Sequence, residues 1–398
     1  MLSRIIDNIK GDKYIWYIIS ILSAISLLLV YSSTRSLAYR NTQGDTEYYL
    51  LRQGIILGVG LFIIFFIHRI DHRYFSRVAQ MMLILSVPLL LYTKFFGVRV
   101  NDASRWIRIP GVGLTFQSSD FARLALIMYT SRMLAKKAGV IKDMKEVSIH
   151  IMLPIVVICG LIMLDNLSSA MILFMTCIVV LFIGRVSTKF IFAIIGGGIV
   201  AASLIFAFSW FFEKDHGRAD MWIKRVQNWW EPNVNGDDYY QQKQANIAIA
   251  KGGIFRIAPG KSTQSNFLPD AFSDFIFATL IEEYGLVGGA MILFLYLLFM
   301  WRLIMLVKKS PRAFGALMAV GLGVSMVLQA IIHMGVNVHL LPNTGITLPL
   351  VSWGGSSIWF NAMALGIILS VSRHTEERTI VAKSSKKEKQ KIVDEIHG

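Results

Sequence analysis

The sequence predicts an all-α polytopic membrane protein with about ten transmembrane helices. Three observations lead to this fold class: 55% of the 398 residues are hydrophobic, only 16% are charged, and the mean hydropathy is +0.56. A protein surrounded by water needs more polar surface than this composition supplies. The formal charge of +15 is therefore expected on cytoplasmic loops rather than on a nucleic-acid-binding face. Cys159 and Cys177 lie inside apolar runs, which indicates buried thiols.

Apolar runs of bilayer length predict the individual spans in order along the chain. The expected spans are 15–31, 54–67, 78–92, 116–134, 149–164, 170–183, 190–212, 275–307, 314–335 and 355–371. The first begins near Ile15 without a small-residue cleavage site, so we expect it to remain as a span rather than to be removed as a signal peptide. The eighth is too long for one perpendicular crossing, so we expect it to tilt or to project beyond the bilayer.

Lysine and arginine residues fix the orientation of these spans. With the N-terminus in the cytoplasm, the inner connections and the tail carry 24 of them, whereas the short outer connections carry 7. Positive charge is in excess on cytoplasmic loops, so this asymmetry predicts that both termini are cytoplasmic. We expect residues 1–373 to form one transmembrane domain and residues 374–398 to form a basic cytoplasmic tail.

Two outer connections stand out for their size and content. The third, 93–115, contains the run NDASRWIRIP. The seventh is a large extracytoplasmic loop, 213–274, between the seventh and eighth spans. Its expected interfacial anchors are Trp222, Trp229, Trp230, Tyr239 and Tyr240. A loop of this length with so many aromatic residues is expected to be functional rather than disordered.

The stretch 268–289, LPDAFSDFIFATLIEEYGLVGG, keeps four carboxylates at the start of the eighth span. Ionised carboxylates at membrane depth cost about 2.5–3.5 kcal/mol each, so a chain that keeps several there is expected to use them. Ser273 is the expected N-cap, which would place Asp274 in the first helical turn with its charged form favoured by the helix dipole. Two interpretations of Asp274 remain open: a solvated residue at the start of a helix, and a base at the membrane surface. Glu282 and Glu283 lie deeper, and we expect them to be packing or cavity groups.

Other candidate motifs are weaker. Asp120 and Arg123 lie three residues apart, which fits either an internal ion pair or a cationic site for a phosphate. The run Gly260-Lys261-Ser262 lacks the earlier glycine that a phosphate-binding loop requires. No His/Glu pair has metal-ligand spacing and no nucleophile elbow is present, so we expect no metal site.

The connection between the ninth and tenth spans has an unusual composition. The stretch 333–361, HMGVNVHLLPNTGITLPLVSWGGSSIWFN, contains two prolines and four glycines but no lysine or arginine. Proline and glycine at membrane depth indicate an irregular, partly re-entrant backbone, which is tolerated where it is buried or lines a cavity. We therefore favour a cavity wall over a plain periplasmic hairpin.

Taken together, these stretches resemble the SEDS (FtsW/RodA/SpoVE) family of shape, elongation, division and sporulation proteins. RWI at 105–107 is similar to the family's RWI or RWL, FQSSDFARLAL to FQPSEFAKLAL, and QANIAIAKGG to QSLIAIGSGG. LPDAFSDFIFATLIEEYG is similar to LPEAHTDFIFAIIGEELG, and LLPNTGITLPLVSWGGSS to LLPTKGLTLPLISYGGSS. The resemblance runs from the first span to about Arg373, and VNVHLLPNTGITLPL is closer to the division type than to the elongation type.

The resemblance implies a peptidoglycan glycosyltransferase of the bacterial plasma (inner) membrane that polymerises lipid II during septal wall synthesis. It also implies partnership with a class B penicillin-binding protein and other divisome proteins, and no nucleic acid. The family's essential aspartate corresponds to Asp274. The expected substrate-binding residues around the outer cavity are Arg105, Gln117, Asp120, Arg123, Gln244, Lys261 and Ser262. The residues that depart from the family pattern are Ser118, Asp120, Arg123, Ala250, Asn166, Ser168 and Thr344.

The mechanism that this resemblance implies is a single inverting displacement. Asp274 acts as general base on the 4-hydroxyl of an acceptor sugar, which attacks C1 of the donor. The leaving pyrophosphate needs counter-charge, which Arg105, Arg123 and Lys261 would supply, with or without a divalent cation such as Mg²⁺ or Mn²⁺. The alternatives are an elongation polymerase of the RodA type, a lipid II flippase, and a scaffold that recruits the transpeptidase through a small-residue helix contact.

Overall fold

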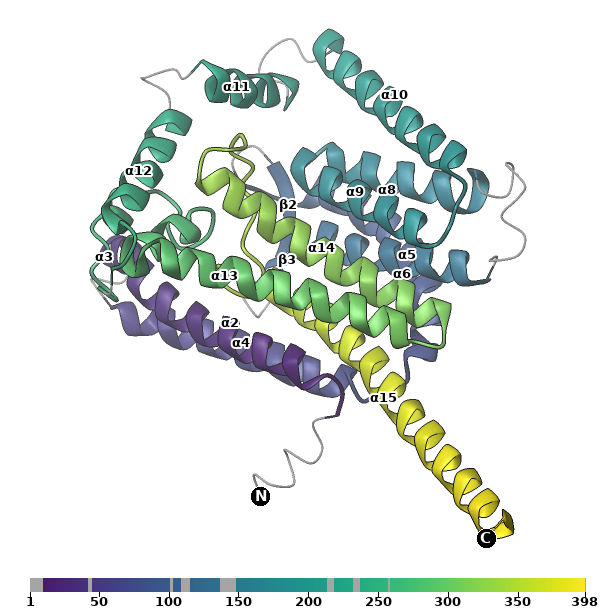
Figure 1. Cartoon of the computed structure of the whole chain (residues 1–398). Coiled ribbons are helices and arrows are strands. Elements are labelled where there is room, and N and C mark those ends of the chain that lie inside the picture. The colour runs from purple at the N-terminus through teal and green to yellow at the C-terminus, as the bar shows by residue number, and fades with distance from the viewer. Residues whose placement is uncertain are drawn as a thin grey trace.

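The computed structural model describes residues 10–41, 45–100, 103–108, 115–136, 148–212, 218–231, 237–256 and 258–397. Each of the ten predicted spans coincides with a helix (Figure 1). These helices are α2 (Lys13–Ser33), α4 (Thr46–Ile67), α5 (His72–Phe96), α6 (Ser118–Lys136), α8 (Leu153–Met163), α9 (Leu167–Ile183), α10 (Thr188–Phe212), α13 (Ile276–Lys309), α14 (Ala313–Asn337) and α15 (Ser356–His397). Within the described ranges, α2, α4, α5, α13 and α14 are long and apolar enough to cross a membrane. The chain is thus an all-α polytopic membrane protein.

The expected outer connections hold the remaining described elements. The helices are α3 (Arg35–Asn41), α11 (Arg218–Trp230) and α12 (Asp237–Gly252), with a 3-10 turn, η2, at Gln264–Asn266. A π-helical turn, η1 (Ser148–Met152), leads into α8. A three-stranded antiparallel sheet, β1 (Val98–Val100), β2 (Ala103–Arg108) and β3 (Thr115–Gln117), was not predicted from the sequence. Strands β1 and β3 have three residues each, too few to show alternation, and the six residues of β2, ASRWIR, do not alternate between apolar and polar side chains.

Helix α14 forms the centre of the bundle. It packs against α13, α6, α9 and α15, and Figure 1 shows it running through the middle of the molecule. Close approach of its neighbours depends on small residues: a Cβ added at Gly323 would lie 2.0 Å from Leu303 Cδ1. Small residues at helix contacts let backbones approach closely inside membranes. The extracytoplasmic end of α14 therefore has a rigid position from which to hold the site.

Helix α13 is two helices joined at Gly285. This glycine has φ 70° and ψ −177°, and a Cβ there would lie 2.5 Å from the carbonyl oxygen of Ile254. The amide of Leu286 instead donates to Gly253 O over 2.9 Å, so the break is paired with the end of α12. The part from Leu286 to Lys309 is about 36 Å long, enough for one crossing. The excess length of the eighth span is thereby explained by a separate short outer helix.

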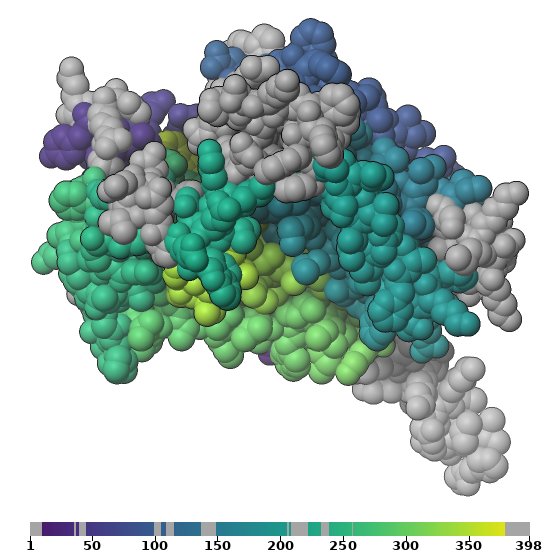
Figure 2. All heavy atoms as spheres, turned by 90° about the horizontal axis from the view of Figure 1, so that it is seen from above, coloured from purple at the N-terminus to yellow at the C-terminus, as the bar shows by residue number. Residues whose placement is uncertain are grey.

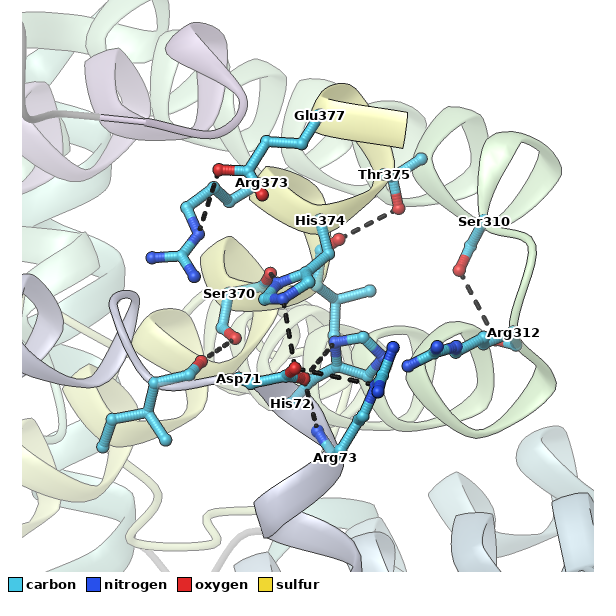
Figure 3. Close-up of polar contacts among 12 residues, drawn as sticks. Asp71, His72, Arg73, Ser310, Arg312, Ser370, Arg373, His374, Thr375 and Glu377 are labelled. Atoms are coloured by element: carbon cyan, nitrogen blue, oxygen red, sulfur yellow. Dashed lines mark hydrogen bonds and ion pairs between the residues drawn. The ribbon is translucent and has the colours of Figure 1, made fainter. Parts of the chain in front are cut away.

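The cytoplasmic ends are joined by polar contacts between distant segments. Asp71 caps α5 by accepting from the Arg73 amide over 2.9 Å, and its other oxygen lies 3.4 Å from His374 Nε2 on α15 (Figure 3). Asp12, the N-cap of α2, accepts from Arg302 Nε at the end of α13 over 2.9 Å. Helix α15 continues without a break past Arg373, so the predicted tail begins as helix.

Candidate active site

A polar cavity of about 350 Å³ lies between the sheet, α6, α9, α14 and the segment that precedes α13. Five of the predicted site residues line this cavity: Arg105, Gln117, Asp120, Arg123 and Asp274. They come from four parts of the chain. The α14–α15 connection contributes Gly345, Thr347 and Trp353 to the same cavity, so the prediction that this connection forms a cavity wall is confirmed.

The α14–α15 connection is buried although it has no regular structure. Leu348, Leu350 and Val351 are at most 4% exposed. Its backbone carbonyls accept hydrogen bonds from other helices: Ser26 Oγ donates to Val351 O over 2.8 Å. Irregular backbone can lie inside a membrane protein when its polar groups are paired in this way.

Asp274 lies in a turn, not in the first turn of the helix. Its amide donates to Asp270 O over 3.1 Å, and α13 begins at Ile276. The prediction that Ser273 is the N-cap is wrong, because Asn337 of α14 supplies the cap. Asn337 Oδ1 accepts from the Ala278 amide over 3.0 Å, while its Nδ2 donates to Asp274 O over 2.9 Å. A buried side chain from another helix therefore fixes the backbone of Asp274.

The electrostatic surroundings of Asp274 place its titration close to neutral pH. Burial and the neighbouring Asp270 raise its pKa to about 6, although the Ser273 hydrogen bond and the charges of Arg225 and Arg105 lower it. At pH 7 about ten carboxyl groups are ionised for each protonated one. Burial raises the pKa of Asp270 as well. Asp274 is therefore a half-buried, mostly ionised carboxylate that opens onto a polar cavity.

The sheet places Arg105 above the cavity. Strand β2 pairs with β3 so that Trp106 lies opposite Gln117. Arg105 Nε donates to Asp165 O, at the end of the α8–α9 connection, over 2.9 Å. Because a backbone carbonyl orients this guanidinium, its remaining N–H groups have a defined direction. Arg105 is also one of the two cations whose charge acts on Asp274.

Arg123 lies at the base of the cavity. Its Nη2 is 3.6 Å from Asp120 Oδ1, so the predicted internal ion pair is present. The same guanidinium donates to Gln329 of α14 and, over 3.0 Å, to Asn361 of α15. Three helices therefore hold Arg123 in place, and it still lines the cavity. The ion pair and the cavity position coexist.

Three predicted site residues lie outside this cavity. Gln244 is on α12, and Lys261 and Ser262 are in the segment that leads to η2. Ser262 is 5% exposed and donates to Glu282. Glu282 is fully buried and also accepts from the Thr263 amide over 3.0 Å. The expectation that Glu282 packs rather than reacts agrees with this position, and substrate binding by these three residues stays a prediction.

Potential cation ligands occur in two places. The active-site cavity has carboxylates at Asp120, Asp270 and Asp274. Oxygen ligands of this kind suit Mg²⁺ when substrate phosphates complete its coordination. Far from the cavity, ligand atoms of Asp71, His72 and His374 lie within 4.8 Å of one another. Sequence spacing could not reveal this second group, because His374 is some 300 positions from the other two.

Two residues that act on Asp274 or line its cavity were not identified from the sequence. Arg225 acts electrostatically on Asp274, but nothing in its local sequence separates it from the other cations of the 213–274 loop. Gln329 lines the cavity and donates to Thr347 O over 2.9 Å. A glutamine inside an apolar span was a usable signal, because polar groups at membrane depth are generally functional or paired.

Comparison with known proteins identifies the family. A family model described as "Cell cycle protein" (FtsW/RodA/SpoVE) matches residues 12–377. The chain belongs to this family. The probable peptidoglycan glycosyltransferase FtsW of Nitrosococcus halophilus is 33% identical over 353 residues, which cover 86% of this chain and 87% of that relative. Stage V sporulation protein E of Bacillus subtilis is 32% identical over 377 residues, which cover 92% of this chain and 97% of that relative.

Solved structures of similar fold support the FtsW/RodA/SpoVE assignment. A chain of a peptidoglycan synthase complex, described as coordinating polymerization and crosslinking, has a TM-score of 0.70 at 25% identity. The match covers 92% of this chain and 98% of that chain. The rod shape determining protein RodA of Thermus thermophilus has a TM-score of 0.65 at 24% identity, with 91% and 97% covered, and this likeness shows a shared fold.

Proposed function

We propose that this FtsW/RodA/SpoVE-family protein is a peptidoglycan glycosyltransferase that polymerises lipid II, with Asp274 as its general base. The observation that carries the proposal is the half-buried carboxylate of Asp274, which opens onto a cavity shared with Arg105 and Arg123. Its pKa of about 6 suits a base at neutral pH, because it is mostly ionised and still accepts a proton. The relatives named as glycosyltransferases support the same reaction class.

The reaction needs one base and one displacement. Asp274 takes the proton of the acceptor GlcNAc 4-hydroxyl as that oxygen bonds to C1 of the donor MurNAc. The bond from C1 to the pyrophosphate oxygen breaks at the same time, and undecaprenyl pyrophosphate leaves with the electron pair. Inversion at C1 converts the α-linked donor into a β-1,4-linked glycan.

Counter-charge for the leaving pyrophosphate comes from the sheet side of the cavity. Arg105 lines the same cavity as Asp274, and its contact with Asp165 O orients its guanidinium. Arg123 also lines the cavity, where it donates to Gln329 and Asn361. Guanidinium groups suit phosphate oxygens because their charge is permanent and their donors are forked. Asp120, Asp270 and Asp274 are the cavity carboxylates that would hold a divalent cation, which would supply further counter-charge.

The setting of this activity is a plasma membrane complex. Both substrates carry a lipid, so the bilayer holds them at one depth and lowers the entropic barrier to reaction. A class B penicillin-binding protein is the proposed partner, since the similar solved chain comes from a complex described as coordinating polymerization and crosslinking. We assign septal synthesis rather than elongation, residues 1–373 to the transmembrane domain and residues 374–398 to a cytoplasmic tail.

The test separates polymerisation from lipid transport. The purified protein with its transpeptidase partner is given labelled lipid II in vesicles, and both glycan strands and transferred lipid are measured. Wild type makes strands, whereas Asp274→Ala binds lipid II without making strands. Strand synthesis by Asp274→Ala at the wild-type rate would refute the proposed base. Lipid transfer without polymerisation by the wild type would instead support a flippase.

A further inference from the structure

A second cavity of about 320 Å³ lies beside the candidate active site. It is enclosed by α11, α12 and the start of the α14–α15 connection. The described residues that line it are Arg225, Asn228, Trp229, Tyr239, Gln242, Lys243, Asn246, Ile247, Ala250, His339 and Asn343. Its size lies in the range of small-ligand pockets. None of these residues belongs to the set that the sequence predicted to bind substrate.

The two faces of α12 pack in different surroundings. Tyr239, Gln242, Asn246 and Ala250 follow one another at helical spacing and line the second cavity. On the other face, Ala245 and Ala248 are fully buried in a small core with Leu268, Ala271, Phe275 and Ala278. That core immediately surrounds the turn that carries Asp274. Helix α12 therefore connects the wall of the second cavity to the candidate base.

The second cavity also adjoins the first through Arg225. Arg225 lines the second cavity and lowers the pKa of Asp274, which lines the first. Its Nη1 donates to Asn343 O over 3.4 Å, and Asn343 is two residues from Gly345 of the active-site cavity. In Figure 2 the residues of the α14–α15 connection lie at the floor of a hollow beside α11. The two cavities are therefore neighbours, linked by Arg225 and by the segment from Asn343 to Gly345.

The lining has the chemistry of a saccharide site. The rings of Trp229 and Tyr239 offer flat apolar faces with polar edges, which suit the C–H faces of a pyranose. The side-chain amides of Asn228, Gln242 and Asn246 pair well with hydroxyl and N-acetyl groups. The cations are Arg225 and Lys243, and the described lining residues include no carboxylate, so an acidic substituent is accepted.

His339 offers the cavity a polar atom without a partner. Its left-handed backbone, with φ 62°, belongs to the C-cap of α14, in which the Leu340 amide donates to Gly335 O over 2.8 Å and the His339 amide to Val336 O over 3.1 Å. Its Nδ1 is buried and has no hydrogen-bond partner in the described part of the chain. Trp229 Nε1 donates to its carbonyl over 3.2 Å, which holds α11 against this residue. Buried polar atoms are normally paired, so an unpaired one that lines a cavity is available to a ligand.

We propose that the second cavity is a subsite for the saccharide of the glycan strand, binding an N-acetylated hexosamine next to the pair of sugars that react at Asp274. This assignment rests on the proposed glycosyltransferase function. The amides and cations of the lining are hydrogen-bonding groups that a saccharide can use and an isoprenoid chain cannot, so a saccharide suits the cavity better than the lipid does. The pyrophosphate is better held by Arg105, which lies on strand β2, on the sheet side of the cavity that Asp274 lines.

The test uses two neighbouring tyrosines of α12. Tyr239 lines the cavity, whereas Tyr240 is 43% exposed and does not. The full-length Asp274→Asn protein is titrated by calorimetry with a lipid-free tetrasaccharide of alternating N-acetylglucosamine and N-acetylmuramic acid, which has no pyrophosphate leaving group and is not a donor. We expect Tyr239→Ala to weaken binding at least tenfold and Tyr240→Ala to change it less than twofold.

A second variant covers the case in which Tyr239→Ala does not fold. Ala250→Trp fills the cavity from an exposed position on α12 without removing a polar group, and it should abolish tetrasaccharide binding. In protein with an intact Asp274, Tyr239→Ala and Ala250→Trp should raise KM by a larger factor than they lower kcat, or should yield shorter glycan strands. No binding at millimolar tetrasaccharide, or equal losses in Tyr239→Ala and Tyr240→Ala, would overturn the proposal.

The test stands apart from that of the proposed function. Binding is measured without catalysis. If the saccharide binds at this cavity but Asp274→Ala polymerises normally, the subsite is supported and the proposed base is refuted. Loss of polymerisation in Asp274→Ala together with unchanged tetrasaccharide binding in Ala250→Trp would support the base and refute the subsite.

Discussion

At the scale of the residue, Asp274 is defined by groups that the linear sequence does not place beside it. Asp270 raises its pKa, Arg105 and Arg225 lower it, and Asn337 holds its backbone. The two cations come from a strand and from an outer helix. The pKa of about 6 thus results from burial and Asp270 acting against two cations, so removing one of these charges shifts the pKa of Asp274 in a predictable direction.

The pH dependence of polymerisation tests this balance. Because the base must be ionised, kcat/KM should fall about tenfold per pH unit below pH 6. Asp270→Asn removes a negative charge that raises the pKa of Asp274, so the acid limb should move to lower pH. Arg105→Gln removes a cation that lowers this pKa and should move the limb to higher pH. Rates measured from pH 4.5 to 8 check both shifts, and identical limbs in all three proteins would contradict the assignment.

At the scale of the element, the break in α13 decides where the site lies. Gly285 separates the short outer helix of Asp274 from the membrane-crossing part, and the freed amides of Leu286 and Val287 pair with Gly253 O and Ile254 O. The short helix is thereby attached to α12, which lines the second cavity. The orientation of Asp274 depends on this junction.

Substitution of Gly285 should therefore be costly. Gly285→Ala places a Cβ 2.5 Å from Ile254 O on a left-handed backbone, so we expect a loss of more than about 2 kcal/mol in unfolding free energy. Thermal unfolding in detergent measures this loss. Gly58→Ala is the matched control, because its Cβ would meet nothing within 4 Å, and it should be neutral or stabilising. Equal stability of the two variants would show that the break is not constrained.

At the scale of the whole molecule, polar contacts at the cytoplasmic face close the bundle. Asp12 caps α2 and pairs with Arg302 of α13, while its amide donates to Ser372 Oγ of α15 over 2.9 Å. The ends of three helices meet at this one side chain. The outer face holds the candidate active site and the second cavity, so these contacts and the proposed chemistry lie at opposite ends of the same helices.

The Asp12 contact should be worth far more than the surface pair beside it. Asp12→Ala leaves Arg302 without its partner and removes a helix cap, so we expect a loss of about 3 kcal/mol. Lys10→Ala breaks only the exposed Lys10–Glu377 pair and should cost less than about 1 kcal/mol. Unfolding temperatures of the two variants give the comparison, and a larger loss for Lys10→Ala would contradict it.

The sequence predicted what depends on local patterns and missed what depends on distant contacts. Apolar runs predicted all ten spans, and the motif residues Arg105, Gln117, Asp120 and Arg123 meet Asp274 at one cavity. Ser273 had the right chemistry for a cap, but Asn337, over 60 positions away, supplies it. The sheet and Arg225 were missed because short strands and loop cations carry no periodic signal.

The most direct test of the proposed mechanism is the single-turnover rate of glycan bond formation in Asp274→Asn. The asparagine keeps the shape of the side chain and cannot take the proton, so the rate should fall about 10²–10⁴-fold while lipid II binding and the unfolding temperature stay near wild type. Asp270→Asn should stay within about tenfold of wild type at pH 7. An Asp274→Asn protein that forms the bond within tenfold of the wild-type rate would show that this carboxylate is not the base.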